Sequence, residues 1–144
     1  MRVLLKERAL LMIEGSDSES FLQNQFSNDI TKIDKSKIQV NAYCQHQGKI
    51  IGLFWVMRSG DHFLISFPND LLEVIKLRLN MFVIMSDVTI TDITQSYKQI
   101  GLIDETSLNS FSIKDNLSLL ILDSKEECDE EIVAENFEWS KACI

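Results

Sequence analysis

The spacing of hydrophobic residues changes several times along the chain, and each change predicts a new element. The unbroken apolar run at residues 9–13, ALLMI, predicts a buried strand. A helix over residues 16–30 follows, because Ser16 and Glu19 have the spacing of an N-terminal capping box. At about 100° per residue, the apolar side chains of this helix gather on one face: Phe21, Leu22, Phe26 and Ile30.

Two polar residues of the same predicted helix, Gln25 and Asp29, project among these apolar side chains. A polar group that faces a core needs hydrogen-bond partners, which either the protein or a bound ligand can supply. A structural network and a ligand-binding role are therefore both open for this pair.

The next stretch predicts an antiparallel meander with a second helix. Alternating residues at 38–44 are typical of a half-buried strand, and the nearly apolar run at 50–57 predicts a buried hairpin partner. Further strands are expected at 62–67 and 86–94, on either side of a helix at 70–82. The broad apolar sector of this helix predicts contact with two elements, through additional residues Val74, Leu77 and Met81.

Two glycines of the predicted hairpin have distinct roles. Gly48 supplies the positive φ that a tight turn requires. Gly52, inside the second strand, predicts a bulge or a close approach by another group, with a simple packing kink as the alternative.

A second unit begins near Tyr97. Residues 98–104 and 117–123 predict two strands, and residues 132–144 predict a helix. We therefore expect an α+β protein of two parts. The first is a domain at 1–96, built as an antiparallel sheet flanked by helices. The second is a partial α+β domain at 97–144. Two strands and one helix leave an open sheet edge and an uncovered face, which predicts self-association or a separate partner.

Charge is distributed unevenly and narrows the function classes. Residues 1–103 carry 11 acidic and 11 basic side chains, whereas residues 104–144 carry 11 acidic and 3 basic, so the net charge of −8 lies in the last segment. An acidic extension repels phosphate, so direct nucleic-acid binding is not expected. No apolar run is long enough for a membrane span or resembles a secretory signal.

Cysteine and histidine usage excludes several kinds of site. The 3 cysteines are widely spaced and the 2 histidines lack helical ligand spacing, so no disulfide framework and no metal site is predicted. This usage fits a reducing, cytoplasmic setting. Cys44 is expected to be a small buried hydrophobe, and His46 an exposed turn residue.

The order of these pieces resembles a known family. The string GSDSESFLQNQFSNDI at 15–30, followed by Tyr43-Cys44 and by QGKI at 47–50, is similar to the N-terminal part of the YgfZ proteins. These are folate-binding proteins of iron–sulfur cluster assembly or repair and of iron–sulfur-dependent tRNA modification. They are related to the aminomethyltransferase T-protein of glycine cleavage. The resemblance implies an antiparallel sheet flanked by helices, with tetrahydrofolate in a channel that later domains complete.

The resemblance also implies where chemistry is retained or lost. The aspartate pair that serves catalysis in the T-protein falls on Gly52 and Leu53, and the K-G-C-x-x-G-Q motif of YgfZ proteins is absent. Neither residue can transfer a proton, so no catalytic residue is assigned. If the strand at 50–57 turns the same face to the ligand as in the family, the ligand-binding residues are the polar pair of the helix, the hairpin lysine and one face of this strand: Gln25, Asp29, Lys49, Leu53, Trp55 and Met57.

The alternatives for these residues stay open. Lys49 can meet a folate carboxylate or be an ordinary exposed lysine. Trp55 and its neighbours can stack on the ligand or fill the sheet core. We therefore expect a non-catalytic tetrahydrofolate-binding accessory protein, binding weakly or only with a missing C-terminal half. A one-carbon transferase and a structural module without folate are the alternatives. The expected partners are iron–sulfur proteins, a separately encoded C-terminal half or a second copy of the chain.

Overall fold

The structure is a computed structural model that describes residues 1–44, 48–105, 107–126 and, for the backbone only, 132–133. Its strands, α-helices and 3₁₀ turns (η) follow in the order β1 (Arg2–Leu4), β2 (Arg8–Glu14), α1 (Ser18–Gln25), η1 (Ile30–Lys32), β3 (Gln39–Cys44), β4 (Ile50–Ser59), β5 (His62–Pro68), η2 (Asn69–Leu71), α2 (Leu72–Phe82), β6 (Thr89–Asp92), β7 (Tyr97–Ile103), β8 (Ser110–Lys114), β9 (Leu117–Asp123) and β10 (Ile132–Val133).

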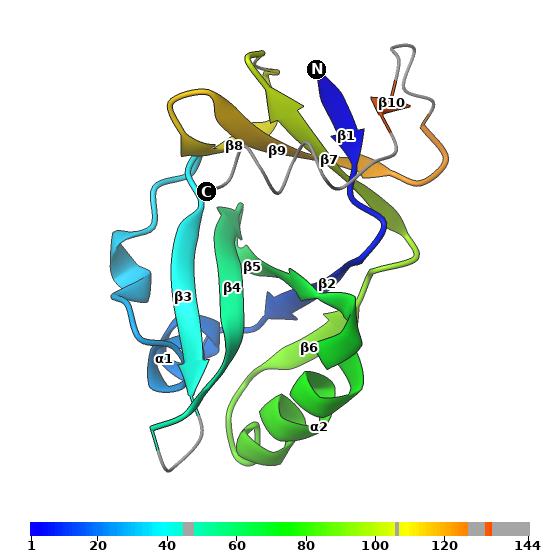
Figure 1. Ribbon diagram of the computed structural model, residues 1–144. Coiled ribbons are helices and arrows are strands. Elements are labelled where there is room, and N and C mark those ends of the chain that lie inside the picture. The colour runs from blue at the N-terminus through cyan, green and yellow to red at the C-terminus, as the bar shows by residue number, and fades with distance from the viewer. Residues whose placement is uncertain (45–47, 106, 127–131, 134–144) are drawn as a thin grey trace.

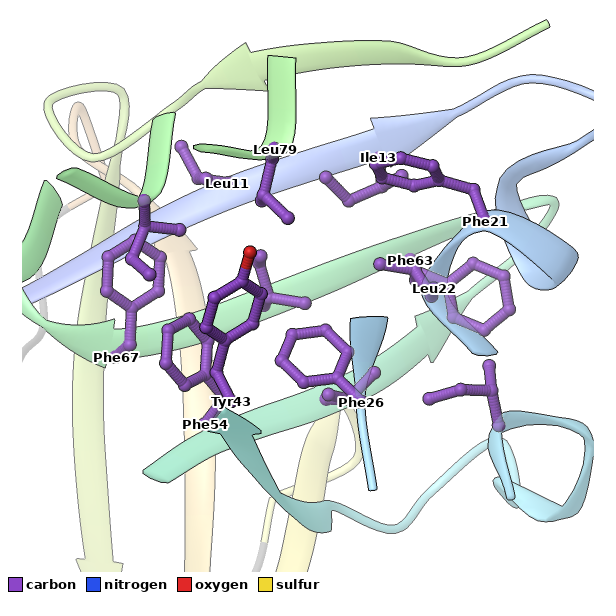
Figure 2. Close-up of a cluster of buried hydrophobic side chains, with 14 of the residues drawn as sticks. Leu11, Ile13, Phe21, Leu22, Phe26, Tyr43, Phe54, Phe63, Phe67 and Leu79 are labelled. Carbon is purple, nitrogen blue, oxygen red and sulfur yellow. The ribbon is translucent and has the colours of Figure 1, made fainter. Parts of the chain in front are cut away.

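The first sheet is antiparallel, with the strand order β3-β4-β5-β2-β6. One of its faces packs against α1 and α2 around a large buried cluster. Four aromatic rings lie at the centre of this cluster, and Phe54 stacks on Phe67 with 4.7 Å between ring centroids. Figure 2 shows Phe26 and Tyr43 beside them, brought together from different elements. Tyr43 on β3 and Phe54 on β4 each alternate with outward residues, so the helix-facing side of the hairpin carries these rings into the cluster.

The second sheet has the order β10-β1-β7-β9-β8 and lies across the top of the view in Figure 1. Its central pairs are antiparallel, whereas β10 runs parallel to β1. It covers part of the face of the first sheet that the helices leave free, and a second buried cluster lies between the two sheets, including Met57, Leu64, Leu117 and Leu119. The predicted α+β fold with an antiparallel sheet flanked by helices is confirmed.

The second sheet contains three strands that periodicity did not reveal: β1, β8 and the two-residue β10, which lies within the predicted helix. β8 lies in the connection expected to be a loop, and β1 pairs with β7, with Arg2 opposite Leu102. The other strands and helices before residue 97 belong to the first sheet and the layer that covers it, although the segment before β3 also bonds to β8, where the Ile38 amide donates to the Ser112 carbonyl at 2.8 Å. The domain division at residue 96 stays a prediction, and the helix predicted over 132–144 lies outside the described residues except for β10.

The prediction of one helix over 16–30 is wrong, because tertiary contacts end α1 at Gln25. The Asn28 amide donates to Asn41 Oδ1 at 2.8 Å, and the Ala42 amide donates to Ser27 Oγ at 3.1 Å. The segment after α1 is therefore held against β3, which competes with continuing the helix. The capping box is also absent: α1 has no side-chain cap, and the Ser16 hydroxyl donates to Asp87 at 2.7 Å.

β3 is half-buried, as predicted, but it buries a polar and an aromatic side chain rather than its aliphatic ones. Asn41 and Tyr43 are buried at 1% and 2% exposure, whereas Val40 is 44% exposed and the Cys44 thiol is exposed. Asn41 tolerates burial because its side-chain amide donates to Gln39 Oε1 while its oxygen accepts from the Asn28 amide. The expectation that Cys44 is a buried hydrophobe is therefore wrong.

The glycine predictions hold. Gly48 has φ 79°, and the β3–β4 register shifts beside Gly52, which pairs with Tyr43. A Cβ on Gly52 would lie 2.8 Å from Leu71 Cδ1, so both the bulge and the close approach are present.

The broad face predicted for α2 is only partly used. Ile75 and Leu79 are buried, but Val74, Leu77 and Met81 are 48%, 66% and 58% exposed, so this helix does not contact a second element there. Neither described helix is long and apolar enough to cross a membrane.

Candidate functional site

The β3–β4 hairpin presents an apolar surface on the side away from the helices. We call Val40, Leu53 and Trp55 the outer hairpin face; Val40 pairs directly with Trp55 across the two strands. Phe54 and Val56 point into the helix-side cluster, so their neighbours Leu53 and Trp55 point the other way. Leu53 is 58% exposed, and Trp55 is partly buried beside the cluster between the sheets.

A guanidinium lies on the indole of this face. Arg8 Cζ is 3.9 Å from the ring centre of Trp55, within the range of a cation–π contact. Arg8 is held there by Ser66, whose hydroxyl accepts from Nε at 2.9 Å and whose carbonyl accepts from Nη2 at 2.8 Å. The outer hairpin face therefore combines exposed apolar area with a fixed positive charge. The sequence analysis missed Arg8, because nothing in its spacing connects it with Trp55.

The six predicted ligand-binding residues do not form one site. Leu53, Trp55 and Met57 share a strand face, but Met57 is completely buried between the sheets while Leu53 is exposed. Figure 1 shows why: one end of β4 meets the second sheet and the other extends beyond it. Lys49 is exposed next to the hairpin turn. The roles of these residues as ligand contacts stay predictions.

Asp29 does not project toward the core, contrary to expectation. Its carboxylate caps η1 by accepting from the Thr31 hydroxyl at 2.6 Å and the Thr31 amide at 3.0 Å. These two hydrogen bonds hold the pKa of Asp29 below its usual range. The group is therefore an ionised, solvent-facing cap rather than a general acid or base within the fold.

Gln25 lies on the other side of the sheet from Trp55. It is the last residue of α1 and lines a pocket together with Phe21 and Tyr43, which belong to the helix-side cluster. No carboxylate occupies the outer hairpin face, and among the residues the structure describes no three His, Cys, Asp or Glu side chains are grouped as metal ligands.

Comparison with known proteins identifies relatives of this chain in sequence and in fold. The chain is 31% identical over 100 residues to the tRNA-modifying protein YgfZ of Colwellia psychrerythraea, covering 69% of this chain and 30% of that protein. It is 29% identical over 94 residues to YgfZ of Buchnera aphidicola, covering 65% of this chain and 30% of the relative. The chain is a partial homologue of the YgfZ and aminomethyltransferase proteins. No family model matches it.

The aminomethyltransferase side of this relationship has its own support. The aminomethyltransferase of Listeria monocytogenes is 29% identical over 92 residues, covering 64% of this chain and 25% of the enzyme. The crystal structure of the glycine cleavage system aminomethyltransferase T from Bartonella henselae superposes with a TM-score of 0.62 at 10% identity, over 69% of this chain and 27% of that one. The T-protein-like fold is thereby confirmed. The chain spans only about a quarter to a third of the length of these relatives.

Proposed function

We propose that this chain is a non-catalytic, reduced-folate-binding part of a YgfZ-like protein that supports tRNA modification through iron–sulfur cluster assembly or repair. The observation that carries the proposal is the outer hairpin face, where Arg8 lies over Trp55 and Leu53 is exposed. A folate offers flat aromatic rings and a carboxylate tail, which match an apolar ledge and a guanidinium. The YgfZ relatives, which bear the name tRNA-modifying protein, support the wider role.

Weak binding is expected from the geometry. The outer hairpin face is a surface rather than an enclosed site, and ligands of high affinity are usually buried over most of their area. We therefore expect a dissociation constant of about 0.1–1 mM for a reduced folate. A separately encoded C-terminal half, a second copy of the chain or an iron–sulfur protein would add enclosure, and these are the partners we propose.

Intrinsic fluorescence tests the proposal directly. The chain has 2 tryptophans, so a Trp139→Phe variant leaves Trp55 as the single indole. We expect saturable quenching when tetrahydrofolate is added. Titration calorimetry should detect binding to the unmodified protein and none to Trp55→Ala. A matched control, Leu77→Ala, removes an equally apolar residue that is 66% exposed on α2 and should bind normally.

Two results would refute the folate assignment. The first is the absence of binding at several times the expected dissociation constant, which would favour a structural module whose pocket is filled by side chains such as Met57. The second is binding that the Trp55→Ala variant leaves unchanged.

We further propose that the chain does not transfer one-carbon units. Gly52 has no side chain, and Leu53 occupies the outward position where proton transfer would be needed. A folate-dependent methylene-transfer assay should give no turnover above background. Turnover that disappears in Asp29→Asn would instead support an aminomethyltransferase, because Asp29 is the carboxylate the sequence analysis placed nearest to such a role.

A further inference from the structure

A second concave site lies on the helix side of the first sheet. It is a pocket of about 420 Å³ between α1, α2 and the end of β3. This volume lies within the range of small-molecule sites. The rings of Phe21, Tyr43 and Phe82 form apolar walls, and the amides of Asn24 and Gln25 contribute polar groups. Tyr43 points into the helix-side cluster, so this pocket and the outer hairpin face lie on opposite sides of the same sheet.

Arg78 gives this pocket its chemical character. Its Nε atom is buried and has no hydrogen-bond partner among the residues that the structure describes, and its Cζ lies 5.9 Å from the ring centroid of Tyr43. Arg2 and Arg58, by contrast, each bond a glutamate at 2.6 Å. A buried donor left unpaired is destabilising, and a ligand that accepts its hydrogen bond relieves this cost. The chain has 22 acidic and 14 basic residues, yet no acidic residue in its described part pairs with Arg78 beside this pocket.

The polar residues around Arg78 are also available to a ligand. The side-chain amides of Asn24 and Gln25 make no hydrogen bond within the described part of the chain, although both line the pocket. None of the described residues that line it is an aspartate or glutamate. A guanidinium with neutral donors and no competing carboxylate is suited to an oxyanion, which its planar fork binds through two hydrogen bonds.

The geometry points to a binding site for a small aromatic anion in this pocket: its carboxylate or phosphate pairs with Arg78, and its planar body lies against Tyr43. Both oxyanions present the same paired oxygens to a guanidinium, and the aromatic walls favour a flat body over a bare inorganic ion. This site is separate from the proposed folate surface and does not depend on it.

The exposed thiol of Cys44, one of the residues that line the pocket, provides a probe beside it. Cys44 is exposed and lines it, and in a Cys128→Ser, Cys143→Ser background it is the single thiol of the 3 in the chain. Iodoacetate and iodoacetamide are close in size, but the first is an anion. The rate of alkylation by iodoacetate divided by the rate by iodoacetamide therefore rises with the positive charge near the thiol. We expect Arg78→Gln to lower this ratio about threefold, the effect of one charge several Å away in water.

A matched variant controls for the loss of a positive charge from the helix. Lys76 lies on α2 two residues before Arg78 and pairs with Asp92 at 3.6 Å, away from the pocket lining. Lys76→Gln should leave the rate ratio unchanged. An equal fall in both variants would show that the ratio reports only the overall charge of α2, and would overturn the assignment to Arg78.

Protection of Cys44 by added ligands gives a second, independent test. Benzoate and phenyl phosphate, at about 10 mM, should slow the alkylation of Cys44 by iodoacetamide, whereas neutral benzamide should not. Arg78→Lys keeps the charge but loses the fork, so protection should weaken. Trp55→Ala should leave protection unchanged, which separates this result from folate binding. Equal protection by benzamide, or none by either anion, would overturn the proposal.

Discussion

A buried polar network between the two sheets gives the most direct test of the fold. Ser66, on β5, has no exposed surface, and Gln99, on β7, is 4% exposed. The Ser66 hydroxyl donates to the Gln99 side-chain oxygen and accepts from Arg8 Nε. The Gln99 amide nitrogen donates to the Ala9 carbonyl at 3.2 Å. Each of these polar groups forms a hydrogen bond with another member of the network. Removing one side chain therefore leaves its partners without a hydrogen bond in a place that water does not reach.

The perturbation is Gln99→Met, which keeps the side-chain length but removes both polar atoms. The Ser66 hydroxyl loses its acceptor and the Ala9 carbonyl loses a donor, so we expect the free energy of unfolding to fall by about 1–3 kcal/mol. For a urea dependence of about 2 kcal/mol per M, a loss of 2 kcal/mol lowers the unfolding midpoint by about 1 M. Ser66→Ala should cost a similar amount.

A double-mutant cycle measures the shared contact by urea unfolding followed by circular dichroism. The Gln99→Met, Ser66→Ala double variant should be more stable than the sum of the single losses predicts, by about 0.5–3 kcal/mol. Ser59→Ala, at the far end of β4, is the control and should be additive with Gln99→Met. Additivity of the Ser66 and Gln99 losses, within about 0.5 kcal/mol, would refute the network as a coupled unit.

Two further predictions concern a turn and a carboxylate. A Cβ on Gly15, whose φ is 118°, would lie 2.0 Å from the Asp87 carbonyl oxygen, so Gly15→Ala should cost about 3 kcal/mol in urea unfolding, far more than Gly60→Ala, which meets no atom within 4 Å. An equal cost for both would contradict the close approach. Partial burial raises the pKa of Asp92, but its hydrogen bonds from the Thr94 hydroxyl and amide outweigh this and hold the pKa below 3.8. The stability that Asp92 contributes is therefore present above that pH and is lost as the pH falls through the lower pKa of the folded state. The difference in free energy of unfolding between wild type and Asp92→Asn should therefore shrink on acidification. A difference that does not depend on pH would contradict this.

The sequence by itself determined the elements whose spacing is local. The apolar run in β2, the β4–β5 meander and the apolar stripe of Ile75 and Leu79 were all readable, because alternation in a strand and 3.6-residue spacing in a helix reflect which side chains are removed from water. The motif from Gly15 to Ile30, with the later Gly48-Lys49, also carried the family relationship that the comparisons confirm.

Only the tertiary structure decided which face each element buries and which residues share a site. Asn41 is buried because a segment beyond α1 bonds to it, and α1 ends at Gln25 for the same reason. The short strand β1 exists because β7, about a hundred residues later, supplies its hydrogen bonds. Likewise Arg8 and Trp55 meet across β2 and β4, strands that are not neighbours in the sheet order. Such partners are fixed by long-range pairing and burial, and local periodicity carries no record of them.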